Sequence, residues 1–205
     1  MNSPATLRFE DVRRRFGRLS VLEGVSGSVS DGGALLVTGP NGSGKSTLLR
    51  CLAGLLVPEA GSIEYTEGDG PLDISERRRR VGFISPDLAF YGELTVEENL
   101  AFFAKLRRAE LARGLEVLAR LSLPTDRRAA NLSSGMRQRL RWGFALMHRP
   151  RLLLLDEPFQ NLDAPGERIT RDLLREHLTG GGLAVVANPS SVEIDLVTGH
   201  IDLGR

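Results

Sequence analysis

The stretch GPNGSGKST, Gly39 to Thr47, constrains this chain more than any other part of its sequence. It fits the pattern G-x-x-x-x-G-K-[ST], follows the apolar run ALLVTG and opens a segment with helical spacing, KSTLLRCLAGLL. A glycine-rich turn between a buried strand and a helix is the context in which this pattern binds phosphate. The alternative is a glycine turn with a fortuitous lysine, and it is disfavoured because the fixed letters rarely coincide by chance.

Each residue type in this loop has a physical role. Gly39, Gly42 and Gly44 allow the backbone to curl so that successive N–H groups point at phosphate oxygens. Lys45 supplies positive charge to the β- and γ-phosphates, Ser46 offers a hydroxyl to Mg²⁺, and the helix N-terminus adds a partial positive charge. The predicted nucleotide-binding residues of the loop are Gly39, Pro40, Asn41, Gly42, Ser43, Gly44, Lys45, Ser46 and Thr47.

A pair of carboxylates follows a second apolar run. In RLLLLDEP, Asp156 and Glu157 stand at the end of a predicted buried strand, which is the edge where α/β sheets bind ligands. Such a pair alone usually marks only a solvated loop start. With a phosphate loop upstream, we expect Asp156 to hold Mg²⁺ and Glu157 to act as general base on the attacking water, or to orient it.

The order of elements predicts an α/β fold. Short strands are expected in TLRFEDV and VSGSVS, and buried strands in ALLVTG, LLLLD and LAVVAN. The alternation of strands and helices favours a mostly parallel sheet. Helical spacing is found from Val96 to about Leu121, and again from Ser134 to about His148.

The helical stretch at roughly 88–149 is predicted to be inserted into the sheet-containing core. The chain is therefore expected to form one domain, 1–205, with a core of 1–87 and 150–205.

Composition excludes several classes of protein. Hydrophobic residues make up 41% and charged residues 26%, ordinary values for a globular protein. The net charge is +1, so no global field favours nucleic acid as a partner. The arginines are nevertheless clustered at 13–15, 77–80, 107–108 and 127–128. Solvated faces are the first interpretation, and a basic patch against anionic lipid or a phosphate ligand is the alternative.

The single cysteine, Cys51, rules out an intrachain disulfide and fits a reducing compartment. It is predicted to be a small buried hydrophobe. The N-terminus lacks the apolar core of a signal peptide, and the longest apolar runs are far too short to span a bilayer. We expect a soluble, cytoplasmic chain, with any membrane spans on other polypeptides.

A glycine-containing turn in front of a second helix selects one family among phosphate-loop proteins. LSSGMRQRL, from Leu132 to Leu140, resembles the signature motif of ATP-binding cassette ATPases, usually LSGGQ, and lies just before the strand that ends at Asp156. ELTVEENL is similar to the entry of that family's helical subdomain, and DEPFQNLD to its carboxylate strand and D-loop. The resemblance implies a phosphate-loop core with N-terminal antiparallel strands and an inserted helical subdomain.

The resemblance also implies further site residues and a partner. Phe16 takes the place of an aromatic ring that stacks on adenine, although taken alone it would be a core aromatic. Asp163 takes the D-loop place. Ser133, Ser134 and Gly135 would face the γ-phosphate of ATP bound by a second cassette arranged head to tail. The implied cofactors are ATP and Mg²⁺, and a monomer should bind nucleotide but hydrolyse it poorly.

Two positions depart from the family pattern. Pro86 or Asp87 stands where a glutamine is usual, and Asp87 could reach Mg²⁺ only through a water. Asn188 stands where a histidine is usual, and it can donate a neutral hydrogen bond but no positive charge. His148 and His200 are poorly placed to substitute. We therefore expect an ATPase with Glu157 as the main catalytic residue, beside Lys45 and Asn188, whose hydrolysis is either slow or assisted across the dimer.

The leading functional expectation is the motor subunit of a membrane transporter. Two cassettes would pair with separate transmembrane permease subunits at the inner face of the cell membrane, through a groove around Pro86–Thr95. In length and in DEPF the chain resembles small exporter cassettes, including the haem exporter of cytochrome c maturation. The alternatives are a soluble cassette ATPase that acts on ribosomes or DNA, and an ATP-binding regulatory subunit that hardly turns over.

Overall fold

A five-stranded parallel sheet forms the centre of the molecule. The computed structural model describes residues 4–68, 70–191, 194 and 196–204. The strands of this sheet lie in the order β6 (Val81–Ile84), β7 (Leu152–Asp156), β8 (Leu183–Asn188), β3 (Ala34–Thr38) and β9 (Val197–Asp202), with every neighbouring pair parallel. The three central strands are almost wholly buried, as their continuous apolar runs predict.

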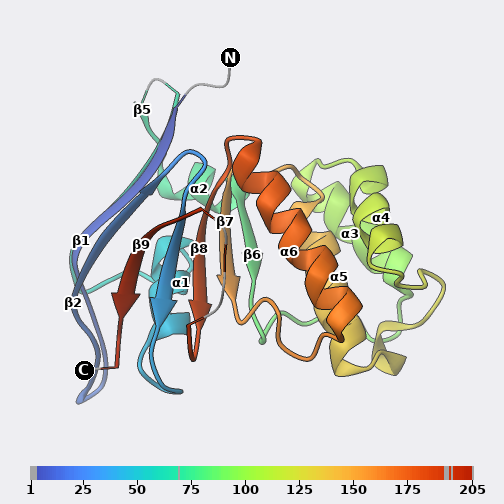
Figure 1. Cartoon of the computed structure of the whole chain (residues 1–205), viewed down its shortest axis with the longest axis horizontal. Helices are drawn as coiled ribbons and strands as arrows, with labels where there is room; N and C mark the ends of the chain where they lie inside the picture. Colours follow the sequence, from blue (N-terminus) through green and yellow to red (C-terminus); the bar gives the residue numbers. More distant parts are fainter. Residues whose placement is uncertain (1–3, 69, 192–193, 195, 205) are drawn as a thin grey trace.

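A second, antiparallel sheet stands beside the first (Figure 1). It contains β1 (Ala5–Phe16), β2 (Leu19–Ser30), β4 (Ala60–Glu67) and the short β5 (Gly70–Pro71), in the order β2-β1-β4-β5. The α/β fold class, with a parallel sheet and N-terminal antiparallel strands, is confirmed.

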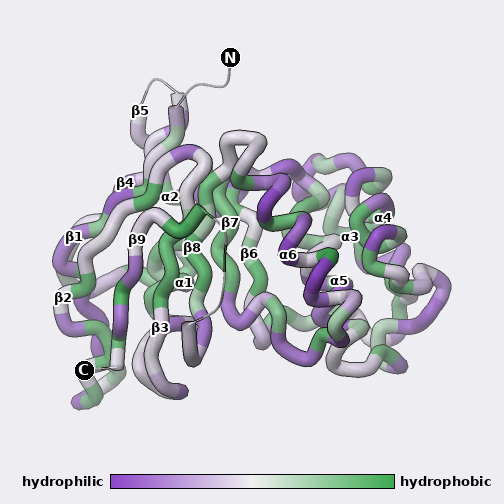
Figure 2. The backbone as a smooth tube through the Cα atoms, viewed as in Figure 1, coloured by the Kyte–Doolittle hydropathy of each residue, from purple (hydrophilic) through white to green (hydrophobic). Residues whose placement is uncertain are grey.

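Helices cover both faces of the parallel sheet. The helix α1 (Lys45–Leu52) lies between the two sheets, where Leu48 and Leu49 join a core with residues of β1, β3 and β7. The other face packs against α5 (Ser134–Leu146) and α6 (Ala164–Thr179). Figure 2 shows the apolar strands at the centre and polar residues along the outer helices. Cys51 is fully buried, as expected.

The region between β6 and β7 is mainly helical. It contains α3 (Val96–Arg107), α4 (Leu111–Arg120) and α5, after the short α2 (Ile74–Arg80), which precedes β6. A capping box at Thr95 starts α3. The predicted helical stretch is divided into two helices because Arg108 takes a left-handed conformation, with φ of 54°, and ends α3. The helix after the signature turn ends at Leu146, slightly before the predicted His148.

A third core cluster lies within this helical region. All of its residues lie between Leu88 and Met147, and they include Val96, Leu100 and Phe144. The same region also contributes Trp142 and Val117 to the core against the parallel sheet. Within the described part of the chain, none of the helices is long and apolar enough to cross a membrane.

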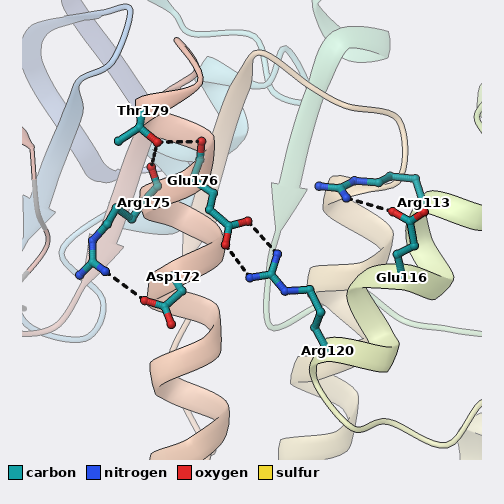
Figure 3. Close-up of polar contacts among 7 residues, drawn as sticks. All are labelled: Arg113, Glu116, Arg120, Asp172, Arg175, Glu176 and Thr179. Atoms are coloured by element: carbon teal, nitrogen blue, oxygen red, sulfur yellow. Dashed lines mark hydrogen bonds and ion pairs between the residues drawn. The ribbon is translucent and has the colours of Figure 1, made fainter.

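An ion pair joins the helical region to α6 (Figure 3). Arg120 of α4 donates two hydrogen bonds to the carboxylate of Glu176, at 2.7 and 2.6 Å. A hydrogen bond from Arg120 lowers the pKa of Glu176 below its usual range. Neighbouring pairs, Arg113 with Glu116 and Arg175 with Asp172, stay within their own helices. Of these three pairs, only that of Arg120 and Glu176 joins α4 to α6.

Candidate nucleotide-binding site

The loop between β3 and α1 curls around a lysine. Gly39, Gly42 and Gly44 all have positive φ, at 144°, 86° and 102°. A Cβ on Gly44 would lie 2.7 Å from the carbonyl oxygen of Val21, so this position admits only glycine. The buried Lys45 donates from Nζ to the carbonyl oxygens of Gly39, at 2.6 Å, and Pro40, at 2.9 Å. The loop therefore holds a positive charge inside a ring of backbone groups.

A cavity of about 370 Å³ opens beside this loop. The residues that line it come from the loop, from β1, β2 and α1, and from the end of β7: Phe16, Val21, Asn41, Gly42, Gly44, Lys45, Ser46, Thr47 and Glu157. The structure thus brings together the predicted phosphate loop, the predicted adenine-stacking ring and the predicted general base. The Phe16 ring is 49% exposed, and the Arg14 guanidinium lies 5.0 Å from its centroid.

Asp156 is a buried carboxylate at the carboxyl end of β7. It is 2% exposed, and its Oδ2 has no hydrogen-bond partner among the described residues. Burial raises the pKa of Asp156, while a hydrogen bond from the Ser46 side chain and the charge of Lys45 act in the opposite direction. A hydroxyl and an unpartnered buried carboxylate oxygen suit a hard cation such as Mg²⁺, which is usually held by one or two protein oxygens together with substrate phosphates. Ser46 and Asp156 therefore fit the predicted metal site.

Glu157 follows in a strained conformation. Its φ is 49°, in the left-handed region that a non-glycine residue seldom adopts, and its backbone N–H donates to the Ala187 carbonyl oxygen at 2.9 Å. Gln160 donates from Nε2 to the Glu157 carboxylate at 2.6 Å. We did not predict Gln160 from the sequence, and only its spacing of three residues from Glu157 could have suggested it.

Two predicted site residues have other contacts. Asn188, at the end of β8, donates from Nδ2 to the Ser190 carbonyl oxygen at 2.9 Å. The exposed Asp87 pairs with Arg50. Among the described residues that line the cavity, neither of the two is present.

His200 lies closer to the loop than its position in the sequence suggests. The strand β9 pairs with β3, and the His200 Nε2 lies 2.7 Å from the Thr38 hydroxyl. Because we did not predict β9, we had no reason to place His200 beside the residue that precedes the phosphate loop. His200 is not among the residues that line the cavity.

The signature turn does not contribute to the lining of this cavity. Ser133 caps α5 by accepting a hydrogen bond from the Met136 N–H at 3.2 Å, and both Ser133 and Ser134 are exposed. A Cβ on Gly135 would lie 2.5 Å from the Asn161 carbonyl oxygen, so the turn packs closely on the segment after β7. The turn therefore presents an exposed helix N-terminus at some distance in sequence from its own phosphate loop.

The helix behind the signature turn is tied to the loop that follows Glu157. Gln138 donates from Nε2 to the carbonyl oxygens of Pro158, at 2.8 Å, and Glu157, at 3.2 Å. The Trp142 indole donates to the Pro158 carbonyl oxygen at 3.0 Å. Asp163 caps α6 and accepts from Arg139 at 2.6 Å, which lowers the pKa of Asp163. A movement of α5 would therefore be transmitted through these hydrogen bonds to Glu157 in the same chain.

A phosphate loop on a buried strand, with a buried aspartate and a glutamate at the same sheet edge, defines a phosphate-loop nucleotide-binding protein. The family model described as ABC transporter matches residues 22–160. This chain belongs to the ABC transporter family.

Similar proteins include the sulfate/thiosulfate import ATP-binding protein CysA of Bradyrhizobium diazoefficiens, 39% identical over 83% of this chain and 52% of that protein. The sn-glycerol-3-phosphate import ATP-binding protein UgpC of Paracoccus denitrificans is 36% identical over 92% of this chain and 55% of that protein. The chain thus spans about half the length of these curated relatives.

Solved structures show the same fold. The ATP-binding subunit of an ABC transporter is similar with a TM-score of 0.76 and 27% identity, over 89% of this chain and 79% of that chain. A putative ABC transporter ATP-binding protein of Pyrococcus furiosus matches with a TM-score of 0.80, over 97% of both chains, at 21% identity.

Proposed function

We propose that this chain is the ATP-binding and ATP-hydrolysing cassette of a membrane transporter, and that it works by ATP-driven head-to-tail dimerisation. The observation that carries the proposal is that the predicted nucleotide-binding residues lie at two separate places on the surface. The chain's own cavity holds the phosphate loop and Glu157, whereas Ser133, Ser134 and Gly135 lie outside it at an exposed helix N-terminus. The names of the relatives, import ATP-binding proteins, support a role in powering transport.

The residues in and beside the cavity have separate chemical roles. Lys45 and the loop amides bind the β- and γ-phosphates, Phe16 stacks on the adenine, and Ser46 and Asp156 hold Mg²⁺. The metal, when bound, neutralises charge that develops on the phosphates. Glu157 accepts the proton of the attacking water, and Gln160 holds its carboxylate in place.

The turn of a second copy completes the site. The partner's signature turn closes over the γ-phosphate and adds helix-terminal N–H groups to it. Asp163, at the start of α6, lies on the segment that packs against Gly135 and would meet the partner in the same interface. A single chain holds two halves of different sites and should hydrolyse ATP poorly.

Turnover is proposed to be slow. Asn188 donates to Ser190, and Asp87 pairs with Arg50, so the two departures from the family pattern have local partners. Losing one well-placed transition-state donor costs roughly 10²–10³-fold in rate. The same two observations favour the second candidate function, an ATP-binding regulatory subunit that hardly turns over.

The permease is proposed to dock near the start of the helical region. Tyr91 and Phe102 are 53% and 38% exposed, and their rings lie 5.0 Å apart. They continue into Phe90, Phe103 and Phe144 beneath. Exposed aromatic rings over a packed base suit a partner segment. This surface belongs to the helical subdomain, proposed as 88–149, and it would hold the cassette at the inner face of the membrane.

The test compares Glu157→Gln with Glu64→Gln, an exposed glutamate on β4, outside the helical region. ATPase rate and ATP-dependent dimerisation are measured on the chain with its permease subunits. We expect Glu157→Gln to lose at least about 100-fold in turnover, while its ATP-stabilised dimer persists. Glu64→Gln should match the wild type. Equal turnover in both variants refutes the role of Glu157, and failure to dimerise with ATP refutes the cassette mechanism. Near-zero wild-type turnover with an intact dimer favours the regulatory subunit.

A further inference from the structure

A second cavity, of about 550 Å³, lies where β6 and β7 begin, at the edge of the sheet opposite to the phosphate loop. The ends of β4, α2, α3 and α5 meet there. Its lining contains six arginines: Arg79, Arg80, Arg107, Arg108, Arg149 and Arg151. Among the described residues, only two carboxylates, Glu67 and Glu110, line it with them. A chain with a net charge of +1 thus concentrates positive charge at one place.

The positive surface extends beyond this cavity. An adjoining hollow of about 570 Å³ is lined by Arg78 and Leu106 and shares Arg79, Arg107 and Arg108 with the first. These shared arginines come from α2 and from the end of α3, which belong to different parts of the chain. The two hollows therefore form one arginine-lined groove.

Ion pairs within the groove leave part of the charge uncompensated. Arg80 pairs with Glu67 at 3.4 Å and Arg149 with Glu110 at 3.8 Å. Arg151 pairs with Asp31 at 2.5 Å. In the part of the chain that the structure describes, the guanidinium groups of Arg79 and Arg108 have no such partner. Two exposed cations are thus available to a ligand.

Arg107 lies at the base of the groove and pairs with no carboxylate among the described residues. Its guanidinium lies 4.8 Å from the centroid of the Phe144 ring, and Nη1 contacts the Val81 carbonyl oxygen at 3.3 Å and His148 Nε2 at 3.1 Å. Burial, which penalises the charged form, lowers the pKa of Arg107. Burial and the nearby Arg107 lower the pKa of His148 to about 4, so the imidazole is neutral at pH 7. His148 Nδ1 is buried without a partner among the described residues.

A partly buried cation in a concave, arginine-rich site suits one class of ligand. Arginine presents several N–H donors in a planar fork that matches phosphate oxygens in pairs. A singly charged ion would leave most of these donors unused. We propose that this groove binds an anion carrying a phosphate with two or more negative charges. Bound there, the anion links α2 and β7 to α3 and α5.

The binding test uses pyrophosphate as the probe. The phosphate loop is first filled with Mg²⁺ and a non-hydrolysable ATP analogue, so that titration calorimetry on the full chain reports only further binding. The test variant Arg79→Gln/Arg108→Gln removes the two cations without a carboxylate partner. The matched control Lys105→Gln/Arg168→Gln removes two exposed cations outside the groove, one of them on α3. Both double variants lower the net charge equally.

We expect one pyrophosphate per wild-type chain, with binding at least 10-fold weaker in the test variant and within 2-fold of wild type in the control. A second arm measures co-sedimentation with phosphatidylcholine vesicles that contain phosphatidate. Pyrophosphate binding assigns a soluble phosphate to the groove. Vesicle binding alone, lost only in the test variant, assigns a lipid headgroup. Binding in neither arm, or an equal loss in the control, overturns the proposal.

Discussion

The two edges of the parallel sheet present different chemical groups to anions. At the carboxyl edge, glycine backbone and one buried lysine form the cradle, and Asp156 and Glu157 stand beside it. At the amino edge, arginine side chains from α2, from the end of α3 and from the segment between α5 and β7 surround a groove. A backbone cradle depends on the conformation of a few consecutive residues, whereas a side-chain groove depends on the packing of distant elements. The two should therefore fail in different ways.

A single added methyl group should be enough to weaken ATP binding at the phosphate loop. We expect Gly44→Ala to weaken ATP binding about 100-fold, because its Cβ would lie 2.7 Å from the Val21 carbonyl oxygen at a φ of 102°. Strain of that kind costs on the order of 2–3 kcal/mol. Equilibrium binding of a fluorescent ATP analogue measures the effect. Gly181→Ala is the control, since Gly181 has a similar φ of 86° with open space around it. An unchanged affinity in Gly44→Ala would show that the loop adapts.

This contrast also explains how much was predictable from the sequence. The cradle and the carboxylates follow strands β3 and β7, whose apolar runs are unmistakable, so both were located by residue number. The arginine groove was visible only as separate clusters, because nothing in the sequence places Arg79 beside Arg108. The end of α3 at Arg108 was missed because its left-handed conformation is adopted by a residue that usually continues helices. The strand β9 was missed because its exposed residues carry no buried apolar run.

The amino edge should respond to acid. The pKa of His148 is lowered to about 4 by burial, from 6.5, so the folded state binds fewer protons than the unfolded state between these values. The contribution of the neutral His148 to the free energy of unfolding is complete above about pH 6.5. As pH falls towards 4, up to about 3 kcal/mol of this contribution is lost. Urea unfolding at pH 7.5 and pH 4.5 should show a smaller loss on acidification in His148→Gln than in wild type.

A comparison variant separates this effect from general acid sensitivity. His177 of α6 also has its pKa lowered by burial, and its Nε2 lies 3.2 Å from the Leu183 carbonyl oxygen. His177→Gln should retain the part of the pH dependence that belongs to His148. Equal losses on acidification in wild type and His148→Gln would mean that the imidazole at the amino edge stays accessible to protons in the folded state.

At the carboxyl edge, a side-chain contact should matter more for rate than for binding. Gln160 donates to the Glu157 carboxylate at 2.6 Å, and we expect Gln160→Met, similar in length but without a donor, to lower kcat about 10-fold with KM unchanged. The reason is that the carboxylate loses its orientation while the phosphate cradle stays intact. Steady-state ATPase kinetics measure both constants. A raised KM with unchanged kcat would place Gln160 in binding instead.

The smallest effect is expected where charged side chains meet in water. Arg120 and Glu176 join α4 to α6, but their side chains are 38% and 55% exposed, so solvent screens the pair. A double-mutant cycle with Arg120→Ala and Glu176→Gln should yield a coupling of about 0.5 kcal/mol at pH 7. The pKa of Glu176 is lowered in the folded state, so this coupling is present above pH 4.5 and is lost as pH falls through the folded pKa.

The pair Arg113 and Glu116, within α4, provides the matched cycle and should yield no more than about 0.5 kcal/mol. A coupling well above 1 kcal/mol between α4 and α6, resistant to salt, would show that geometry outweighs screening at this surface. The arginine groove differs from this pair because Arg107 is half-buried against an aromatic ring, and a unit of charge there should therefore interact more strongly than at this exposed surface.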